Sequence, residues 1–165
     1  MRFRLPVLIL ALAGLAAPAF AQSEVQAPRD ARYVFVGVSK SDSGVVRTTY
    51  VAAPEKAVEH GQARVWVIDV FQTPIKTPKG VGVYSTADET FDCDQGSVRT
   101  TRGGLFDAKG AMIDSFTSNG DFEVSTPGSM GFTTGAIVCK TNFGDVPSVS
   151  GLAAAIADGK TRPAQ

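Results

Sequence analysis

Alternating apolar and polar positions predict a series of β-strands along most of the chain. In residues 32–39, three valines fall on one face of the predicted strand, while Tyr33 and Phe35 fall on the other. Residues 63–72 carry apolar side chains on both faces, which is typical of a central strand covered on both sides. Further strands are predicted at residues 45–51, 80–91, 97–101 and 111–117, with a short alternating stretch at 122–124. Prolines 74 and 78 are expected to bound a loop after the central strand.

The hydrophobic period changes after Pro127, where the chain is expected to turn from strand to helix. Ser129 is placed to cap a helix in which Phe132, Ala136 and Cys139 share one face. The glycines in this helix weaken it, so a last strand over residues 136–143 is the alternative. Whether it is a helix or a strand, the segment after Pro127 is expected to cross back over a face of the sheet before it reaches Cys139.

Two shorter helices are expected elsewhere. Ser148 is a candidate N-cap for a C-terminal helix that aligns Val149, Leu152 and Ile156 and stops at Gly159. Pro54 suits the first turn of a short helix that ends near residue 61. The pattern therefore predicts an α+β fold: a small antiparallel sheet of about six strands, one helix tethered to it, and a short C-terminal helix.

The beginning of the chain has the three regions of a secretory signal peptide. Arg2 and Arg4 precede a short apolar run, and Ala19-Phe20-Ala21 is a small-residue cleavage site. The apolar run is short for a bilayer about 30 Å thick, so a retained membrane helix is the weaker interpretation. We expect residues 1–21 to be removed and residues 22–31 to form a flexible leader. No cysteine lies near the cleavage site, so lipid attachment is not expected.

Length and charge narrow the class of protein. The 144 residues that follow the signal peptide are enough for one domain, which we place at 32–143, with a helix and tail at 144–165. Both charges of the signal peptide are arginines, so the mature chain has 14 basic and 16 acidic residues. A net charge near −2 argues against a nucleic-acid partner, which usually requires a basic face. The mature protein is expected in the periplasm or outside the cell.

Two cysteines, Cys93 and Cys139, are the only ones in the chain. In an exported protein the simplest prediction is a structural disulfide between them. It would close a loop of 46 residue steps and stabilise the fold by about 4 kcal/mol through loop entropy. A redox-active pair is the alternative, but the spacing is not that of a Cys-x-x-Cys motif.

Few residues suggest chemistry. His60, the only histidine, has no serine motif near it and is expected to be a solvated loop residue. Asp92 and Asp94 flank Cys93; a solvated sheet edge is the simpler interpretation, and a calcium site the alternative. No metal, cofactor or catalytic residue is therefore assigned. Arg99, Arg102 and Lys109 lie near one predicted hairpin; an ordinary solvated face is the default interpretation, and a basic patch that binds an acidic partner is the alternative. A core group in the central strand is expected to consist of Trp66, Ile68 and Val70.

Several short motifs follow one another in a recognisable order. They are Val65-Trp66-Val67, Phe91-Asp92-Cys93 with an arginine-containing strand after it, Phe106-Asp107 before Gly110, Pro127-Gly128-Ser129 and Val138-Cys139. In this order and spacing, the region 33–139 resembles the surface-adhesin protein E family of exported bacterial proteins. The resemblance implies a small antiparallel sheet with a packed helix and a stabilising disulfide. It brings no catalytic residues.

The resemblance also implies a function. The family's named member is a lipid-anchored adhesin for host matrix glycoproteins, whereas this chain lacks the lipid-attachment cysteine, and Tyr33 stands where a tryptophan is expected. We therefore expect an exported, non-enzymatic binding or structural module with a protein or glycoprotein partner. A true matrix adhesin is the alternative, followed by a carboxylate-based enzyme or a small-molecule carrier. A sheet edge left free would also permit a homodimer.

Overall fold

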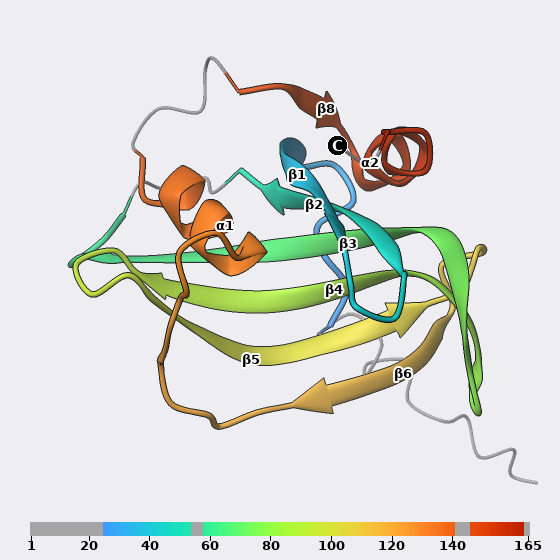
Figure 1. Cartoon of the computed structure of the whole chain (residues 1–165), viewed down its shortest axis with the longest axis horizontal. Coiled ribbons are helices and arrows are strands. Elements are labelled where there is room, and N and C mark those ends of the chain that lie inside the picture. Colours follow the sequence, from blue (N-terminus) through green and yellow to red (C-terminus); the bar gives the residue numbers. More distant parts are fainter. Residues whose placement is uncertain (1–24, 54–57, 141–145, 164–165) are drawn as a thin grey trace, which may run out of the picture.

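One antiparallel sheet dominates the computed structural model, which describes residues 25–53, 58–140 and 146–163 (Figure 1). Within these ranges the sheet has eight strands: β1 (Arg32–Lys40), β2 (Val46–Ala52), β3 (Gln62–Thr77), β4 (Gly80–Asp92), β5 (Ser97–Phe106), β6 (Met112–Thr117), β7 (Glu123–Val124) and β8 (Ser148–Ser150). Their order is β6-β5-β4-β3-β2-β1-β8, and β7 pairs with β5. The antiparallel sheet is confirmed, but the expected number of about six strands is too low, because β7 and β8 are very short.

Strand β3 is longer than the sequence pattern suggested. It continues to Thr77 through Pro74, which was expected to bound a loop. The pairing of β3 with β4 shifts register between Val70 and Ile75, so the proline lies in an irregularity where its missing N–H breaks no ladder bond. The chain then reverses at residues 78–79 and returns as β4.

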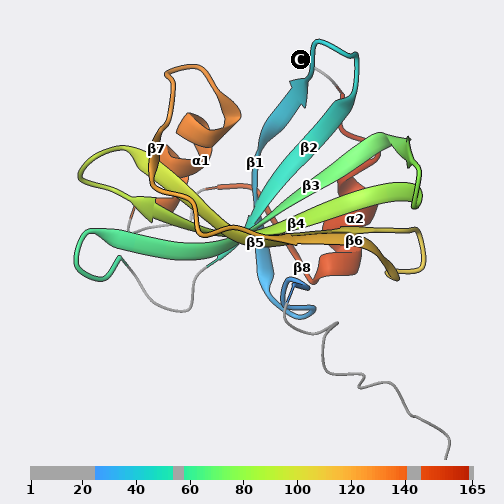
Figure 2. The same ribbon diagram turned by 90° about the horizontal axis from the view of Figure 1, so that it is seen from below.

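The two faces of the sheet have separate cores, as the period of two along each strand requires. One face, which we call the α2 face, buries Tyr33, Tyr50 and Ile68 beneath the helix α2 (Leu152–Gly159). The opposite face, the α1 face, buries aliphatic side chains such as Val67 together with Val138 of the helix α1 (Met130–Val138). Figure 2 shows the two helices on different sides of the twisted sheet.

Helix α1 begins where the sequence predicted and buries a different set of residues. The Oγ of Ser129 accepts a hydrogen bond of 3.1 Å from the backbone N–H of Phe132. Thr134 and Val138 are buried, whereas Phe132 is 44% exposed, so the predicted stripe of Phe132, Ala136 and Cys139 is wrong. The alternative strand is excluded for 136–138, and its residues 141–143 lie outside the described ranges.

Ser148 begins the edge strand β8 instead of capping α2. Ser148, Val149 and Ser150 pair with the start of β1, and α2 follows Gly151, whose φ of 86° lies in the left-handed region. Glycine adopts this conformation without the steric cost that a side chain would add. The predicted helix after Pro54 falls partly on residues outside the described ranges, and the residues that follow form a turn with a bridge between Glu59 and Gln62.

Residues 25–31, expected to belong to a flexible leader, are packed against the sheet. Val25 and Ala27 are buried, and the carbonyl oxygen of Val25 accepts a hydrogen bond of 2.5 Å from Thr86 Oγ1. The backbone carbonyl of Arg29 accepts from the N–H of Leu152 at 2.8 Å, which joins this segment to α2. The prediction of a flexible leader is wrong for these residues, because the polar composition of the segment does not reveal that Val25 and Ala27 are buried. The signal peptide lies outside the described residues.

The predicted disulfide is present. Cys93 and Cys139 are joined, with their Cα atoms 5.5 Å apart. Cys139 is the C-cap of α1 and Cys93 follows β4, so the bond holds the end of the helix against the turn between β4 and β5. Neither helix of the described ranges has the length and apolar character that crossing a membrane requires.

Candidate functional site

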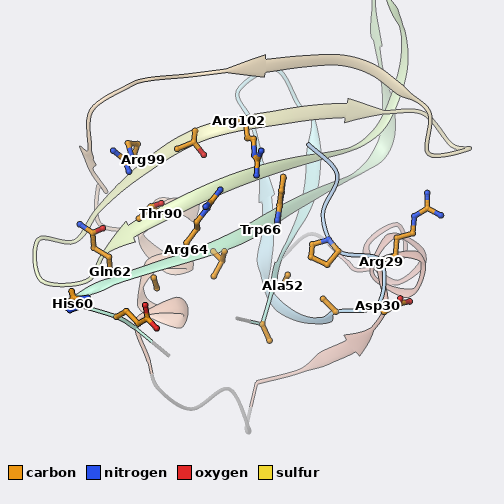
Figure 3. A pocket seen from close by; sticks show the side chains of 17 residues that line it. Arg29, Asp30, Ala52, His60, Gln62, Arg64, Trp66, Thr90, Arg99 and Arg102 are labelled. Carbon is orange, nitrogen blue, oxygen red and sulfur yellow. The ribbon is translucent and has the colours of Figure 1, made fainter. Parts of the chain in front are cut away.

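An open groove of about 1160 Å³ lies on the part of the α2 face that α2 leaves uncovered (Figure 3). Its floor consists of side chains from β3, β4 and β5, and its walls come from residues 28–31, the end of β2 and the turn before β3. We call it the arginine groove, because its floor is formed mainly by Arg64, Trp66, Thr90, Arg99 and Arg102.

Strand register arranges the floor in two rows. Arg64 pairs with Thr90, which pairs with Arg99, so one row crosses three strands with an arginine at each end. Because neighbouring strands are about 4.8 Å apart, the Cα atoms of the two arginines are separated by about 10 Å. Two residues further along β3, Trp66 and Arg102 flank Asp88 in the same way.

Asp88 is the buried anchor of these side chains. It is 1% exposed, and its carboxylate accepts hydrogen bonds from Arg64 Nε at 2.8 Å and Arg102 Nε at 2.9 Å, with a further bond from Arg64 Nη2. Burial alone would raise the pKa of Asp88, but the hydrogen bonds and charges of the two arginines outweigh it and hold the pKa below its usual range. The carboxylate therefore stays ionised and fixes both guanidinium groups.

Trp66 is less buried than the prediction of a core residue required. Ile68 and Val70, predicted with it, are fully buried. Trp66 packs against the same cluster but is only partly buried, and it lines the groove. The guanidinium of Arg102 lies 5.6 Å from the centre of its ring, within the range of a cation–π contact. An aromatic surface therefore belongs to the floor of the groove.

Arg99 differs from the other two arginines because it pairs with none of the described carboxylates. Its guanidinium lies 4.8 Å from the centre of the Phe122 ring, which orients the charged plane. Its Nε is buried and finds no acceptor among the described residues. The positive charge of Arg99 is thus held in place at the groove without a counterion among the residues that the structure describes.

The structure brings together only part of the predicted basic patch. Arg99 and Arg102 share the groove, whereas Lys109 lies in the turn between β5 and β6, where its backbone N–H binds Asp107 Oδ1 at 2.8 Å. Arg64 belongs to the site and was missed. The sequence pattern could have indicated it: Arg64 and Trp66 are two positions apart in the strand predicted at residues 63–72, so both side chains point to the same face.

Two residues that were considered for catalysis or metal binding, His60 and Asp92, lie at turns of the chain. His60 lines one end of the groove at a turn, with a φ of 52°. Asp92 Oδ1 accepts from the backbone N–H groups of Asp94 and Gln95, so it shapes the turn after β4. No group of three histidine, cysteine, aspartate or glutamate side chains in the described part of the chain is arranged to hold a metal ion.

A second polar group lies on the opposite, α1 face. Asp69 accepts a hydrogen bond of 2.5 Å from Thr49 and forms an ion pair of 3.2 Å with Arg47. Nearby, Glu89 accepts from Thr100 Oγ1 at 3.4 Å. Burial and the negative charge of Asp69 raise the pKa of Glu89 to about 7, although Thr100 and Arg47 act in the other direction.

The chemistry of the groove is that of anion binding. Guanidinium groups present planar pairs of N–H donors that match carboxylate geometry, and fixed arginines have less freedom left to lose on binding.

The family model for surface-adhesin protein E matches residues 35–140. The chain belongs to the surface-adhesin protein E family. The match spans both cysteines and every residue of the groove floor, whereas no curated protein and no solved structure matches the chain.

Proposed function

We propose that this surface-adhesin protein E domain is an exported, non-enzymatic binding module that holds an acidic partner in the arginine groove. The observation that carries the proposal is Arg99, a cation oriented by Phe122 and left without a carboxylate among the described residues. Beside it, Arg64 and Arg102 are fixed by Asp88. The two rows together form a positive surface on a rigid floor.

Preorganisation supports a binding role. An arginine that must be ordered on binding loses side-chain entropy, and this loss reduces affinity. In the groove, a buried carboxylate already orders Arg64 and Arg102, and the Phe122 ring orders Arg99. The groove can therefore accept a negative group with little rearrangement.

The side chains of the floor favour binding over catalysis. A general acid or base works best with a pKa near the working pH. Asp88, the buried carboxylate that anchors Arg64 and Arg102, has a lowered pKa, and both of its oxygens are occupied by these arginines. It is suited to positioning and not to moving a proton.

Family membership supports a partner outside the protein's own cytoplasm, and the predicted signal peptide agrees with it. A host matrix glycoprotein is one partner class, and a periplasmic protein is the other. A homodimer through a sheet edge stays a prediction: among the described strands β6 pairs only with β5, and its Phe116 is 51% exposed. Light scattering across a concentration series would measure it.

The test uses the mature protein, starting at residue 22, against immobilised matrix glycoproteins and against periplasmic extract. Arg99→Gln should weaken binding at least tenfold because it removes the unpaired charge and keeps much of the side-chain stem. Lys109→Ala is the matched control, since it removes a cation outside the groove. Equal binding by both variants would place the binding site elsewhere.

A further inference from the structure

We infer that the ligand of the arginine groove is an acidic oligosaccharide whose uronate carboxylate lies between Arg64 and Arg99. This inference rests on the proposed function and names the chemistry of the partner. The carboxylate would lie above Thr90, which separates the two arginines in the strand register. A sugar ring of the same chain would pack beside the exposed part of Trp66.

The row of Arg64, Thr90 and Arg99 supplies the anion subsite. Arg64 gives its Nε and Nη2 to Asp88, which leaves the donors of Nη1, and its side chain is 62% exposed. Arg99 has its guanidinium oriented over Phe122. Two guanidinium groups about 10 Å apart at their Cα atoms can donate to the same carboxylate from opposite sides.

The size of the groove favours an oligomer. Pockets for single small molecules usually have volumes of about 300–1000 Å³ and enclose their ligand. This groove reaches about 1160 Å³ and is open. It runs from His60 and Gln62 at one end to Arg29 and Asp30 near α2 at the other (Figure 3). A ligand longer than one ring is needed to fill it.

The floor favours a sugar chain over a peptide. Extended peptides commonly bind by adding their backbone to a free sheet edge. Here the backbone groups of β3, β4 and β5 are paired with one another, so the floor offers side chains only. An aromatic surface, hydroxyl and amide groups and separated cations suit rings that carry hydroxyls and carboxylates. Trp66, Thr90 and Gln62 supply the uncharged part of this set.

The experiment follows the indole N–H signal of Trp66 by NMR, which is unambiguous because the chain has one tryptophan. The probes are hexagalacturonate and a hyaluronan hexasaccharide, with methyl-esterified hexagalacturonate as the uncharged match and hexaglutamate as the acidic peptide. We expect either uronate to shift the indole signal and the ester to leave it unchanged. Raising the salt concentration from 50 to 500 mM should weaken uronate binding, since screening reduces the attraction between exposed charges.

Variants connect the signal to the subsite. Arg99→Gln should weaken uronate binding at least tenfold, Arg99→Lys should restore part of it, and Lys109→Ala should leave it unchanged. Thermal unfolding of each variant checks that it folds, and Arg64→Gln provides a second test if Arg99→Gln does not. The inference is overturned if neither uronate binds, if the ester binds equally well, or if hexaglutamate binds more tightly. If uronates fail while glycoprotein binding still depends on Arg99, the proposed function stands and this inference alone fails.

Discussion

Replacing Asp88 with asparagine tests the central feature of the groove. The substitution keeps the size of the side chain and removes its charge. An asparagine has one carbonyl oxygen to offer, and its NH₂ group would face the N–H donors of Arg64 or Arg102. Both arginines would lose their fixed partner, and a site with 1% exposure would contain a poorly satisfied polar group.

The magnitude follows from the bonds that are lost. A hydrogen bond to a charged group contributes about 1.5–3 kcal/mol, and removing one member of a fully buried ion pair costs about 3–5 kcal/mol. The side chains of Arg64 and Arg102 are 62% and 31% exposed, so water can solvate them once they are released. We therefore expect Asp88→Asn to lower the free energy of unfolding by about 2–3 kcal/mol.

Urea denaturation of the mature protein at pH 7 measures this loss. Asp114→Asn is the control, because Asp114 forms an ion pair of 2.6 Å with Lys79 on the exposed β6 edge. Surface pairs contribute little, so the control should be much closer to wild type. If the two variants lose equal stability, or if Asp88→Asn loses none, the reasoning about a buried anchor is wrong.

The pH dependence provides a second check on Asp88. Its pKa is lowered in the folded state, so the folded protein binds this proton less readily than the unfolded chain does. The stabilisation is therefore complete above the unfolded value near 3.9 and disappears as the pH falls through the folded pKa. The difference between wild type and Asp88→Asn should shrink over that acid range and remain constant near neutrality.

Three further predictions concern the rest of the fold. Because the pKa of Glu89 is raised in the folded state, wild-type stability should fall as the pH rises from about 4.5 to 7, by at most about 3–4 kcal/mol. Denaturation series at several pH values should show that Glu89→Gln removes this slope. Reducing the disulfide should cost about 4 kcal/mol, and hydrogen exchange should show α1 losing protection before β3; uniform loss would contradict a local tether. Gly103→Ala should lower the free energy of unfolding by about 1–3 kcal/mol, since its Cβ would lie 2.6 Å from both the Phe116 ring and the Thr86 carbonyl oxygen. Gly131→Ala in α1 has room for a Cβ and should stabilise the protein. Equal shifts of the thermal unfolding temperature in the two variants would refute this.

Much of the sheet could be predicted from the sequence because covered strands show a period of two. The faces assigned to β1 and β3 agree with the structure: Val34 and Val67 lie in one core, and Tyr33 and Ile68 in the other. The short strands were harder. Ser148 carries a strong cap signal, but tertiary pairing with β1 decides its conformation, and three residues are too few to show an alternation.

The groove could be predicted only in part, because it depends on strand register. Arg64 and Asp88 are 24 positions apart, and the sequence does not indicate which residue of β4 pairs with which residue of β3. The predicted strand at residues 80–91 implies that Asp88 and Glu89 point to opposite faces, but it does not indicate that Asp88 meets two arginines. Lys109 is close to Arg102 in sequence, and the turn after β5 carries it away.

The packing of residues 25–31 affects the order in which the protein can form. Arg32 pairs with Ser150, and the carbonyl of Arg29 binds the N–H of Leu152, so the earliest described part of the chain is completed by some of the last. Contacts between such distant residues form slowly, and during synthesis the early partner exists long before the late one. Nascent chains shorter than about 150 residues therefore lack the strand and helix that close this side of the sheet. The sheet can therefore reach its native state only after β8 and α2 have been made.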